Sequence, residues 1–283
     1  MTRVSVSLSL AACLFSGTAF AQTTPVVNVI SIGREVIKEG RAAAHERVEA
    51  DWARTERRIK SPAYYVALNS QSEPEVWFVS GYPSFKAIEE NSSFMDKAPI
   101  KAEMELLDAR DGELRASSHG MTAIFRPDLS YHADRVQIGK AKAWMLTSVR
   151  VRIGRENDFA QGWKMFTAAY DKINWPFSSV CYQVIAGAPD GTYLIWVPLE
   201  SMARIDEFGP LEPKLMEAMG PNFSTMMKAA GELFASMDTT LFRVSPIMSY
   251  VSKETEDQDQ AFWRPKMPAK PAAEAKPNEK TGQ

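Results

Sequence analysis

Along this 283-residue chain, segments with the apolar periodicity of a strand alternate with segments that have the apolar periodicity of a helix. The order of these segments in the first half is repeated in the second half. Stretches rich in β-branched residues predict strands, and apolar stripes at steps of three and four predict helices. In the first half the predicted elements are a strand at 26–32, a helix at 40–60, strands at 64–68 and 76–80, a helical region from 84 to 107 and a strand at 121–125.

The second half predicts the same order. Its elements are a strand at 144–151, a helix at 157–173, strands at 180–185 and 193–197, helical regions at 201–208 and 211–236 and a strand at 240–244. Shifted by 114 residues, Gly40-Arg41 meets Gly154-Arg155 and Pro62 meets Pro176. Each half therefore predicts a β-α-β-β-α-β unit of the ferredoxin-like kind, and the chain predicts a duplication.

A ferredoxin-like sheet has helices on one face and leaves the other face to be buried. The strand at 26–32 has apolar residues on both of its faces, and so does the strand at 76–80. We therefore predict an α+β fold in which two tandem ferredoxin-like βαββαβ domains pack sheet to sheet as an intramolecular dimeric α/β barrel. The predicted copies span 26–131 and 141–250, and residues 132–140 link them.

Both ends of the chain differ in composition from these units. Residues 1–21 carry Arg3, an apolar run and small residues before Gln22, which predicts a signal peptide cleaved after Ala21 and a periplasmic or secreted protein. Lipidation at Cys13 is the alternative. Residues 252–283 are rich in Lys, Glu and Pro, which predicts a disordered tail. Within it, Phe262-Trp263 could dock on the second domain or recognise a partner.

Charge and cysteine usage narrow the function classes. The formal net charge is -2 at pH 7, which argues against nucleic acid as a partner. No second apolar run is long enough for a transmembrane helix. Without the predicted signal peptide, Cys181 is the one remaining cysteine, so no intramolecular disulfide is expected. Cys181 lies in a predicted strand, which favours a buried, unreactive thiol. A monomer and a homodimer both remain open.

The passage Trp77-Phe78-Val79-Ser80-Gly81-Tyr82, followed by Ser84-Phe85 and Ser93-Phe94, resembles the dimeric α+β barrel superfamily. This group includes antibiotic-biosynthesis monooxygenases and NIPSNAP-type proteins. The resemblance implies a shape, with activities that range from cofactor-independent oxygenation to haem degradation. Haem-degrading members have a histidine on the second helix, and neither half has one there, so we expect no cofactor.

Few residues offer recognisable chemistry. The three histidines, His45, His119 and His132, show no metal-ligand spacing, so no metal site is predicted. His45 lies on the apolar stripe of its helix, at the position of Phe159 in the second half, which favours packing over catalysis. With Tyr82 and Arg34 it is nevertheless a candidate catalytic residue, because each could present a polar group to a cavity between the sheets.

Aromatic side chains give the better indication of a site, because the chain has more large rings than two small cores plainly need. The candidate ligand-binding residues are Trp52, Tyr64, Trp77, Trp163, Tyr182, Trp196 and Arg150, the last as an anchor for a carboxylate. We expect an exported module that binds a small hydrophobic or aromatic ligand or is structural. The alternative is a cofactor-independent monooxygenase or isomerase that acts on an aromatic substrate within the barrel.

Overall fold

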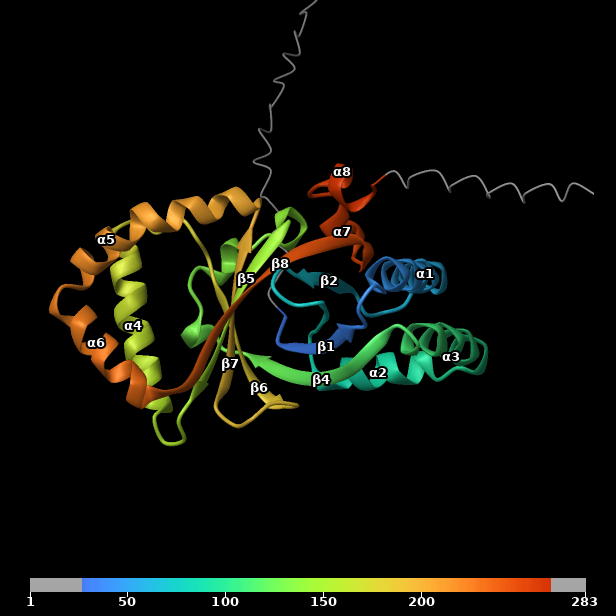
Figure 1. The fold of residues 1–283 in the computed structure, drawn as a ribbon, viewed down its shortest axis with the longest axis horizontal. Helices are drawn as coiled ribbons and strands as arrows, with labels where there is room; N and C mark the ends of the chain where they lie inside the picture. Colours follow the sequence, from blue (N-terminus) through green and yellow to red (C-terminus); the bar gives the residue numbers. More distant parts are fainter. Residues whose placement is uncertain (1–26, 266–283) are drawn as a thin grey trace, which may run out of the picture.

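A computed structural model describes residues 27–265 of the chain, and its eight strands form one closed antiparallel barrel (Figure 1). Around the barrel the strand order is β1-β3-β2-β8-β5-β7-β6-β4. The predicted signal peptide at 1–21, the alternative lipidation at Cys13 and the last part of the predicted tail lie outside the described residues.

The observed elements follow the predicted order, with longer strands. The first half contains β1 (Val29–Ile37), α1 (Ala42–Ile59), β2 (Tyr65–Ser70), β3 (Glu75–Tyr82), α2 (Phe85–Met95), α3 (Ala98–Gly112) and β4 (Arg115–Phe125). The second half contains β5 (Ala143–Val151), α4 (Glu156–Lys172), β6 (Val180–Ala186), β7 (Thr192–Leu199), η4 (Met202–Glu207), α5 (Phe208–Met219), α6 (Pro221–Leu233) and β8 (Phe234–Tyr250). Between them lie η1 (Pro127–Leu129), η2 (Ala133–Arg135) and η3 (Ile138–Lys140).

The predicted fold class is wrong in one essential respect, because the sheets of the two halves do not stack as separate domains. Instead β2 pairs with β8, with Leu68 opposite Val244, and β4 pairs with β6, with Ile124 opposite Gln183. The physical reason is that two stacked sheets leave four edges with unpaired backbone groups, whereas closure pairs every edge. Hydrophobic patterning reports which faces are buried and contains no information about how edges pair.

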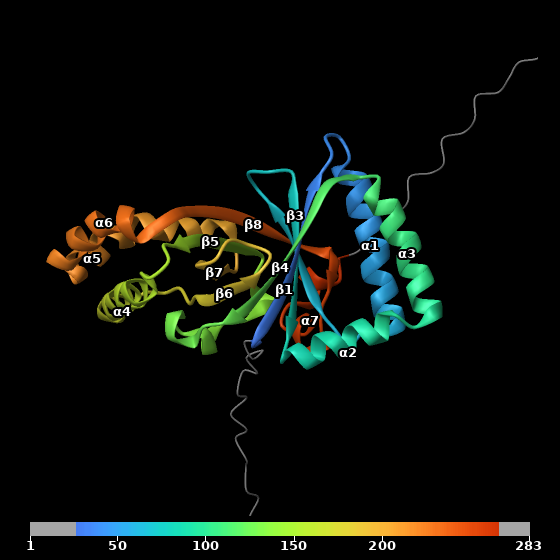
Figure 2. The same ribbon diagram turned by 90° about the horizontal axis from the view of Figure 1, so that it is seen from below.

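The helices cover the outside of the barrel in two groups (Figures 1 and 2). Helices α1, α2 and α3 lie on the side of the first half, and α4, α5 and α6 lie on the side of the second. The entry to the first helix of each half is built alike, since Gly40 and Gly154 have φ values of 73° and 84°. Only glycine adopts such values without strain, which accounts for its recurrence at matched positions.

The barrel interior is a single hydrophobic core shared by both halves. Its members include Leu68, Trp77, Trp144, Leu146, Leu194, Trp196 and Phe242. Trp77 from the first half meets Trp196 from the second with ring centroids 5.9 Å apart and nearly perpendicular planes. Edge-to-face contact of this kind is favourable for aromatic rings. The two halves therefore share one core and form a single folding unit around it.

The prediction of a disordered tail is wrong for the part that the structure describes. Residues after β8 form two short helices, α7 (Lys253–Glu256) and α8 (Gln260–Trp263), above one end of the barrel (Figure 1). Trp263 is 3% exposed, and its Nε1 donates a hydrogen bond of 2.7 Å to the carbonyl oxygen of Gly139. The pair Phe262-Trp263 thus docks on the connection between the halves, and we call residues 252–264 the cap. Among residues 27–265, no helix combines the length and apolar character needed to cross a bilayer.

The fit of the cap depends on a glycine. A Cβ atom at Gly139 would lie 2.3 Å from the carbonyl oxygen of Thr255 in the cap. We expect Gly139→Ala to lower the free energy of unfolding by about 1–3 kcal/mol, the usual effect of overpacking, and to raise hydrogen exchange within the cap. Denaturant unfolding and hydrogen-exchange mass spectrometry measure these effects.

The matched control is Gly231→Ala, because Gly231 lies in α6 with no atom near the added Cβ. This change should leave the cap unaffected and stabilise the protein by about 0.5–1 kcal/mol through helix propensity. Equal exchange in the cap of both variants would contradict the packing described here.

Candidate functional site

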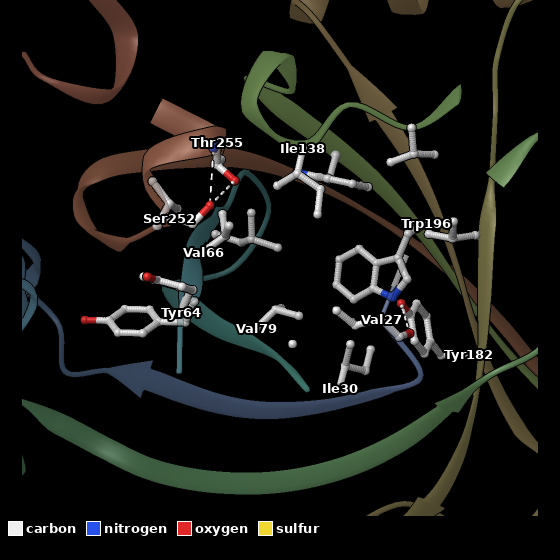
Figure 3. Close-up of a pocket in the computed structure, with 17 residues that line it drawn as sticks. Val27, Ile30, Tyr64, Val66, Val79, Ile138, Tyr182, Trp196, Ser252 and Thr255 are labelled. Atoms are coloured by element: carbon white, nitrogen blue, oxygen red, sulfur yellow. Dashed lines mark hydrogen bonds between the residues drawn. The ribbon is translucent and has the colours of Figure 1, made fainter. Parts of the chain in front are cut away.

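A cavity of about 210 Å³ lies inside the barrel at the end covered by the cap (Figure 3). Its walls are almost entirely apolar. The lining residues are Val27, Ile30, Tyr64, Tyr65, Val66, Leu68, Val79, Gly81, Val136, Ile138, Trp144, Val180, Tyr182, Trp196, Val251, Ser252 and Thr255. The residues come from both halves, from the connection between them and from the cap, so the cavity exists only in the assembled barrel.

Strand alternation accounts for the wall. Successive side chains of a strand point to opposite faces, so Val66 and Leu68 of β2 face the interior while Ala67 packs outside with Ile37 and Met248. The sequence expectation placed Val136 and Ile138 in a linker and Ser252 and Thr255 in a disordered tail. Both segments instead close the cavity, and hydrophobic periodicity could not reveal them because neither belongs to a long strand or helix.

Two aromatic residues bring polar atoms to this apolar space. The Tyr182 hydroxyl donates to the backbone oxygen of Val27 at 3.0 Å, and burial raises the pKa of Tyr182 far above its ordinary value. Trp196 is 4% exposed, and its buried Nε1 has no hydrogen-bond acceptor among the described residues. Figure 3 shows both rings on the same side of the cavity. An unpaired buried indole N–H in a residue of the cavity wall is a donor that the described residues leave unsatisfied.

The structure brings three of the seven predicted ligand-binding residues to this cavity, namely Tyr64, Tyr182 and Trp196. Tyr64 lies at its rim, 43% exposed, with its ring against Tyr250. Trp77 is in the barrel core but does not line the cavity. Arg150 is exposed near the end of β5.

The remaining two predicted residues, Trp52 and Trp163, lie outside the barrel. Trp52 is on α1, where its indole donates to Glu56 Oε1 at 3.3 Å. Trp163 is on α4 and lines a second hollow of about 360 Å³ between the helices of the second half and the outer face of β5 and β7. The aromatic residues of the sequence thus serve several separate places.

None of the three candidate catalytic residues lines the barrel cavity. Arg34 stacks over Trp77, with 4.5 Å from guanidinium carbon to ring centroid, and pairs with Glu75 at 2.7 Å. Tyr82 lies under α2, where its hydroxyl accepts a 3.5 Å hydrogen bond from Asn91. His45 is buried on the other side of the sheet, between α1 and β1.

His45 belongs to a polar cluster that sequence reasoning missed. Its Nε2 lies 2.9 Å from Glu35 Oε2 and 3.4 Å from Asp111 Oδ1. Glu49, one helical turn further along α1, is buried in the same place, and one ligand atom from each of the four side chains lies within 4.8 Å of the others. Burial and the neighbouring acids raise the pKa of Glu49 to about 9.

A signal for this cluster is present when the two halves of the sequence are aligned. Shifted by 114 residues, His45 and Glu49 meet Phe159 and Trp163. A polar pair at positions that are aromatic in the other half indicates a buried polar group, whereas the spacing of the histidines alone carries no such indication. Glu35 and Asp111 could not be found in this way, since their partners come from other elements.

Cys181 is fully buried, as expected for an inert thiol, and burial raises its pKa to about 12. Thiolate is the reactive form, so a thiol with this pKa is a poor nucleophile near neutral pH.

Comparison with solved structures shows a shared fold at very low sequence identity. An anthrone oxidase-like protein superposes with a TM-score of 0.51 and 9% identity, over 82% of this chain and 96% of that one. A provisionally assigned monooxygenase of Lactobacillus acidophilus gives 0.49 and 8%, over 77% and 94%. Chlorite dismutase of Candidatus Nitrospira defluvii gives 0.45 and 11%, over 81% and 94%. No family model and no curated protein sequence matches the chain.

These likenesses concern the fold alone. The chain shares its fold, an α+β barrel, with the anthrone oxidase-like protein. The NIPSNAP-like part of the resemblance seen in the sequence stays a prediction. The site must be argued from its own residues, because one fold carries many chemistries.

Glu56, the partner of Trp52, gives a test of this packing. Burial raises the pKa of Glu56 to about 7, against an ordinary value of 4.5, and the hydrogen bond from Trp52 opposes the rise. A carboxyl with a raised pKa favours the folded state most below pH 4.5, and this contribution is lost as the pH rises through 7. Glu56→Gln should therefore gain about 2–3 kcal/mol relative to the original protein between pH 4 and pH 8.

Denaturant unfolding at the two pH values measures this gain. Glu46→Gln is the control on the same helix, because Glu46 is exposed and should show no such difference. A gain that does not depend on pH would show that Glu56 is not desolvated as described.

Proposed function

We propose that this protein binds a small, mainly apolar ligand with one hydrogen-bond acceptor inside the barrel. The unpaired Nε1 of Trp196 in an otherwise apolar cavity carries this proposal. A buried donor without an acceptor is costly, by about 1–3 kcal/mol, and a ligand oxygen placed against it removes that cost. The apolar walls supply affinity, and the indole supplies orientation.

The size of the cavity sets the class of ligand. An engineered apolar cavity of about 150 Å³ in another protein accommodates benzene. The present cavity, at about 210 Å³, therefore suits one substituted aromatic ring or an aliphatic molecule of similar volume. Its walls offer no lysine, arginine or histidine that would pair with a charged ligand, so a ketone, phenol or ester fits better than a carboxylate.

The lining favours binding over catalysis. A cofactor-independent monooxygenase or isomerase needs a group that removes a proton from its substrate. The walls contain no carboxylate and no imidazole, and the buried Tyr182 hydroxyl already donates to Val27. The tyrosine pKa, raised by burial, makes a phenolate base unfavourable near neutral pH. The enzyme hypothesis therefore lacks a base at this cavity.

The proposal also places this protein outside the cytoplasm. The composition of residues 1–21 supports a cleaved signal peptide and a periplasmic or secreted location. A binding module outside the cytoplasm would meet small apolar molecules before they cross the inner membrane. Detection of the mature chain beginning at Gln22 in a periplasmic fraction would test this part.

The binding proposal is tested with two probes of equal shape, acetophenone and α-methylstyrene, which differ in a carbonyl oxygen against a methylene group. The original protein should bind acetophenone more tightly. Trp196→Phe keeps a ring but removes the donor, so it should weaken acetophenone binding about 5–10-fold and leave the affinity for α-methylstyrene unchanged, consistent with one hydrogen bond. Isothermal titration calorimetry measures both affinities.

Val66→Phe is the companion variant, because an added ring at this wall position fills the cavity and should abolish binding of both probes. Binding of neither probe by the original protein, or an equal loss of both on Trp196→Phe, would contradict the assigned role of the indole. Native mass spectrometry of protein purified from its own cell envelope would then show whether any small molecule is retained.

A further inference from the structure

The buried cluster of Glu35, His45, Glu49 and Asp111 has the composition of a metal site. Three elements contribute to it: β1 gives Glu35, α1 gives His45 and Glu49, and α3 gives Asp111. A divalent ion with bonds of about 2.0–2.2 Å holds its ligand atoms roughly 3–4.4 Å apart. The observed limit of 4.8 Å between ligand atoms approaches this range, and side-chain shifts of under an ångström would close the remainder.

The fold does not require polar groups at these positions. In the second half, Val149, Phe159 and Trp163 stand where Glu35, His45 and Glu49 stand in the first. Strand pairing extends this comparison to Asp111. Arg115 pairs with Ile37 in the first half, and Phe234 pairs with Val151 at the matching place in the second. Four residues before Arg115 and Phe234 stand Asp111 and Ala230, so Ala230 is the counterpart of Asp111. The same architecture is thus built with an apolar core at this place, and the polar core of the first half needs a separate explanation.

The cluster is incompletely satisfied by the protein alone. Glu49 is 6% exposed, and its carboxyl forms no hydrogen bond or ion pair with the described residues. Asp111 is 1% exposed, and its Oδ1 has no hydrogen-bond partner although it faces His45 Nε2. A buried carboxylate oxygen without a hydrogen bond is unfavourable. Asp111 Oδ1 is such an oxygen, and a cation among the four side chains would contact it together with the Glu49 carboxyl.

Arg115 supports the cluster from outside. Its guanidinium contacts Glu35 Oε1 at 2.7 Å and Asp111 Oδ2 at 3.1 Å. These are the outer oxygens, so the inner ones, Glu35 Oε2 and Asp111 Oδ1, are left to face His45. Outer contacts that orient ligand carboxylates in this manner are usual around bound metals.

We propose that Glu35, His45, Glu49 and Asp111 bind one divalent transition metal ion, of the Zn²⁺ or Mn²⁺ class, which ties α1 and α3 to β1. Three carboxylates and the Arg115 guanidinium carry a combined charge of 2−, which a dication neutralises. An imidazole among the ligands favours a transition metal over Ca²⁺ or Mg²⁺. Four protein ligands in a buried place form a closed, structural site.

The experiment uses tag-free protein treated with EDTA and dialysed, and titrates it with Zn²⁺, Mn²⁺ or Mg²⁺. With excess Zn²⁺ or Mn²⁺ the melting temperature should rise by about 5–10 °C, whereas Mg²⁺ should have little effect. Elemental analysis after removal of unbound ion should give one metal per chain for the better of the two transition metals.

The decisive variant is Glu49→Gln, which removes the carboxylate that would bind the metal and keeps the shape of the side chain. Without metal it should melt no lower than the original protein, and with metal it should show no rise. Glu46→Gln, exposed on the same helix, should respond to metal as the original protein does. His45→Phe, which copies Phe159 of the second half, should also lose the response.

Two results would overturn the metal proposal. An equal metal response in Glu49→Gln and the original protein would place the ion elsewhere and overturn the proposal. The absence of a metal response in the original protein would mean that the cluster holds protons and no metal, which also overturns the proposal.

Discussion

Hydrogen bonding between the edge strands of the two halves is the constraint on which the rest of the structure depends. The pairings β2–β8 and β4–β6 turn two four-stranded sheets into one closed barrel. Closure removes every exposed edge, and it brings inward-facing residues of both halves into one core. The apolar cavity is a consequence, because its walls combine β1, β2 and β3 with β5, β6 and β7. Neither half could form this cavity without the other.

Much of the local structure could be predicted from the sequence, because local structure has a local cause. The helix at 40–60 and the hairpin at 64–80 follow from periodicity and from Pro62, and the structure has α1, β2 and β3 there. The likeness between the two halves extends to the backbone, since Lys60 and Asn174 both have a positive φ, at 54° and 51°. The features that the sequence did not predict depend on contacts between residues far apart in the chain. Edge pairing has no residue signature, and the cap depends on contacts such as Trp263 with Gly139, far apart in the sequence.

The candidate site was predicted in part for the same reason. The excess of aromatic residues predicted rings within the barrel, and in the structure Tyr182 and Trp196 line its cavity. Composition could not show on which face of its element each ring lies, so Trp52 and Trp163 were assigned to the wrong place. The walls formed by Val136, Ile138 and Thr255 come from segments whose order depends on docking to the finished barrel, and propensity alone does not report that.

The two halves lie in one chain, so they can differ beneath their first helices. In a symmetric dimer, any residue that forms a polar cluster in one subunit forms it in the other. Two halves of a single chain are free of this restriction. Here the space between helix and sheet holds His45 with three carboxylates in the first half, and Phe159 with Trp163 and a hollow of about 360 Å³ in the second. Since both arrangements lie outside the barrel, either can change without disturbing the strand pairing that forms the central cavity. The closed sheet is therefore common to both halves, whereas the layer between helices and sheet has different residues in each half.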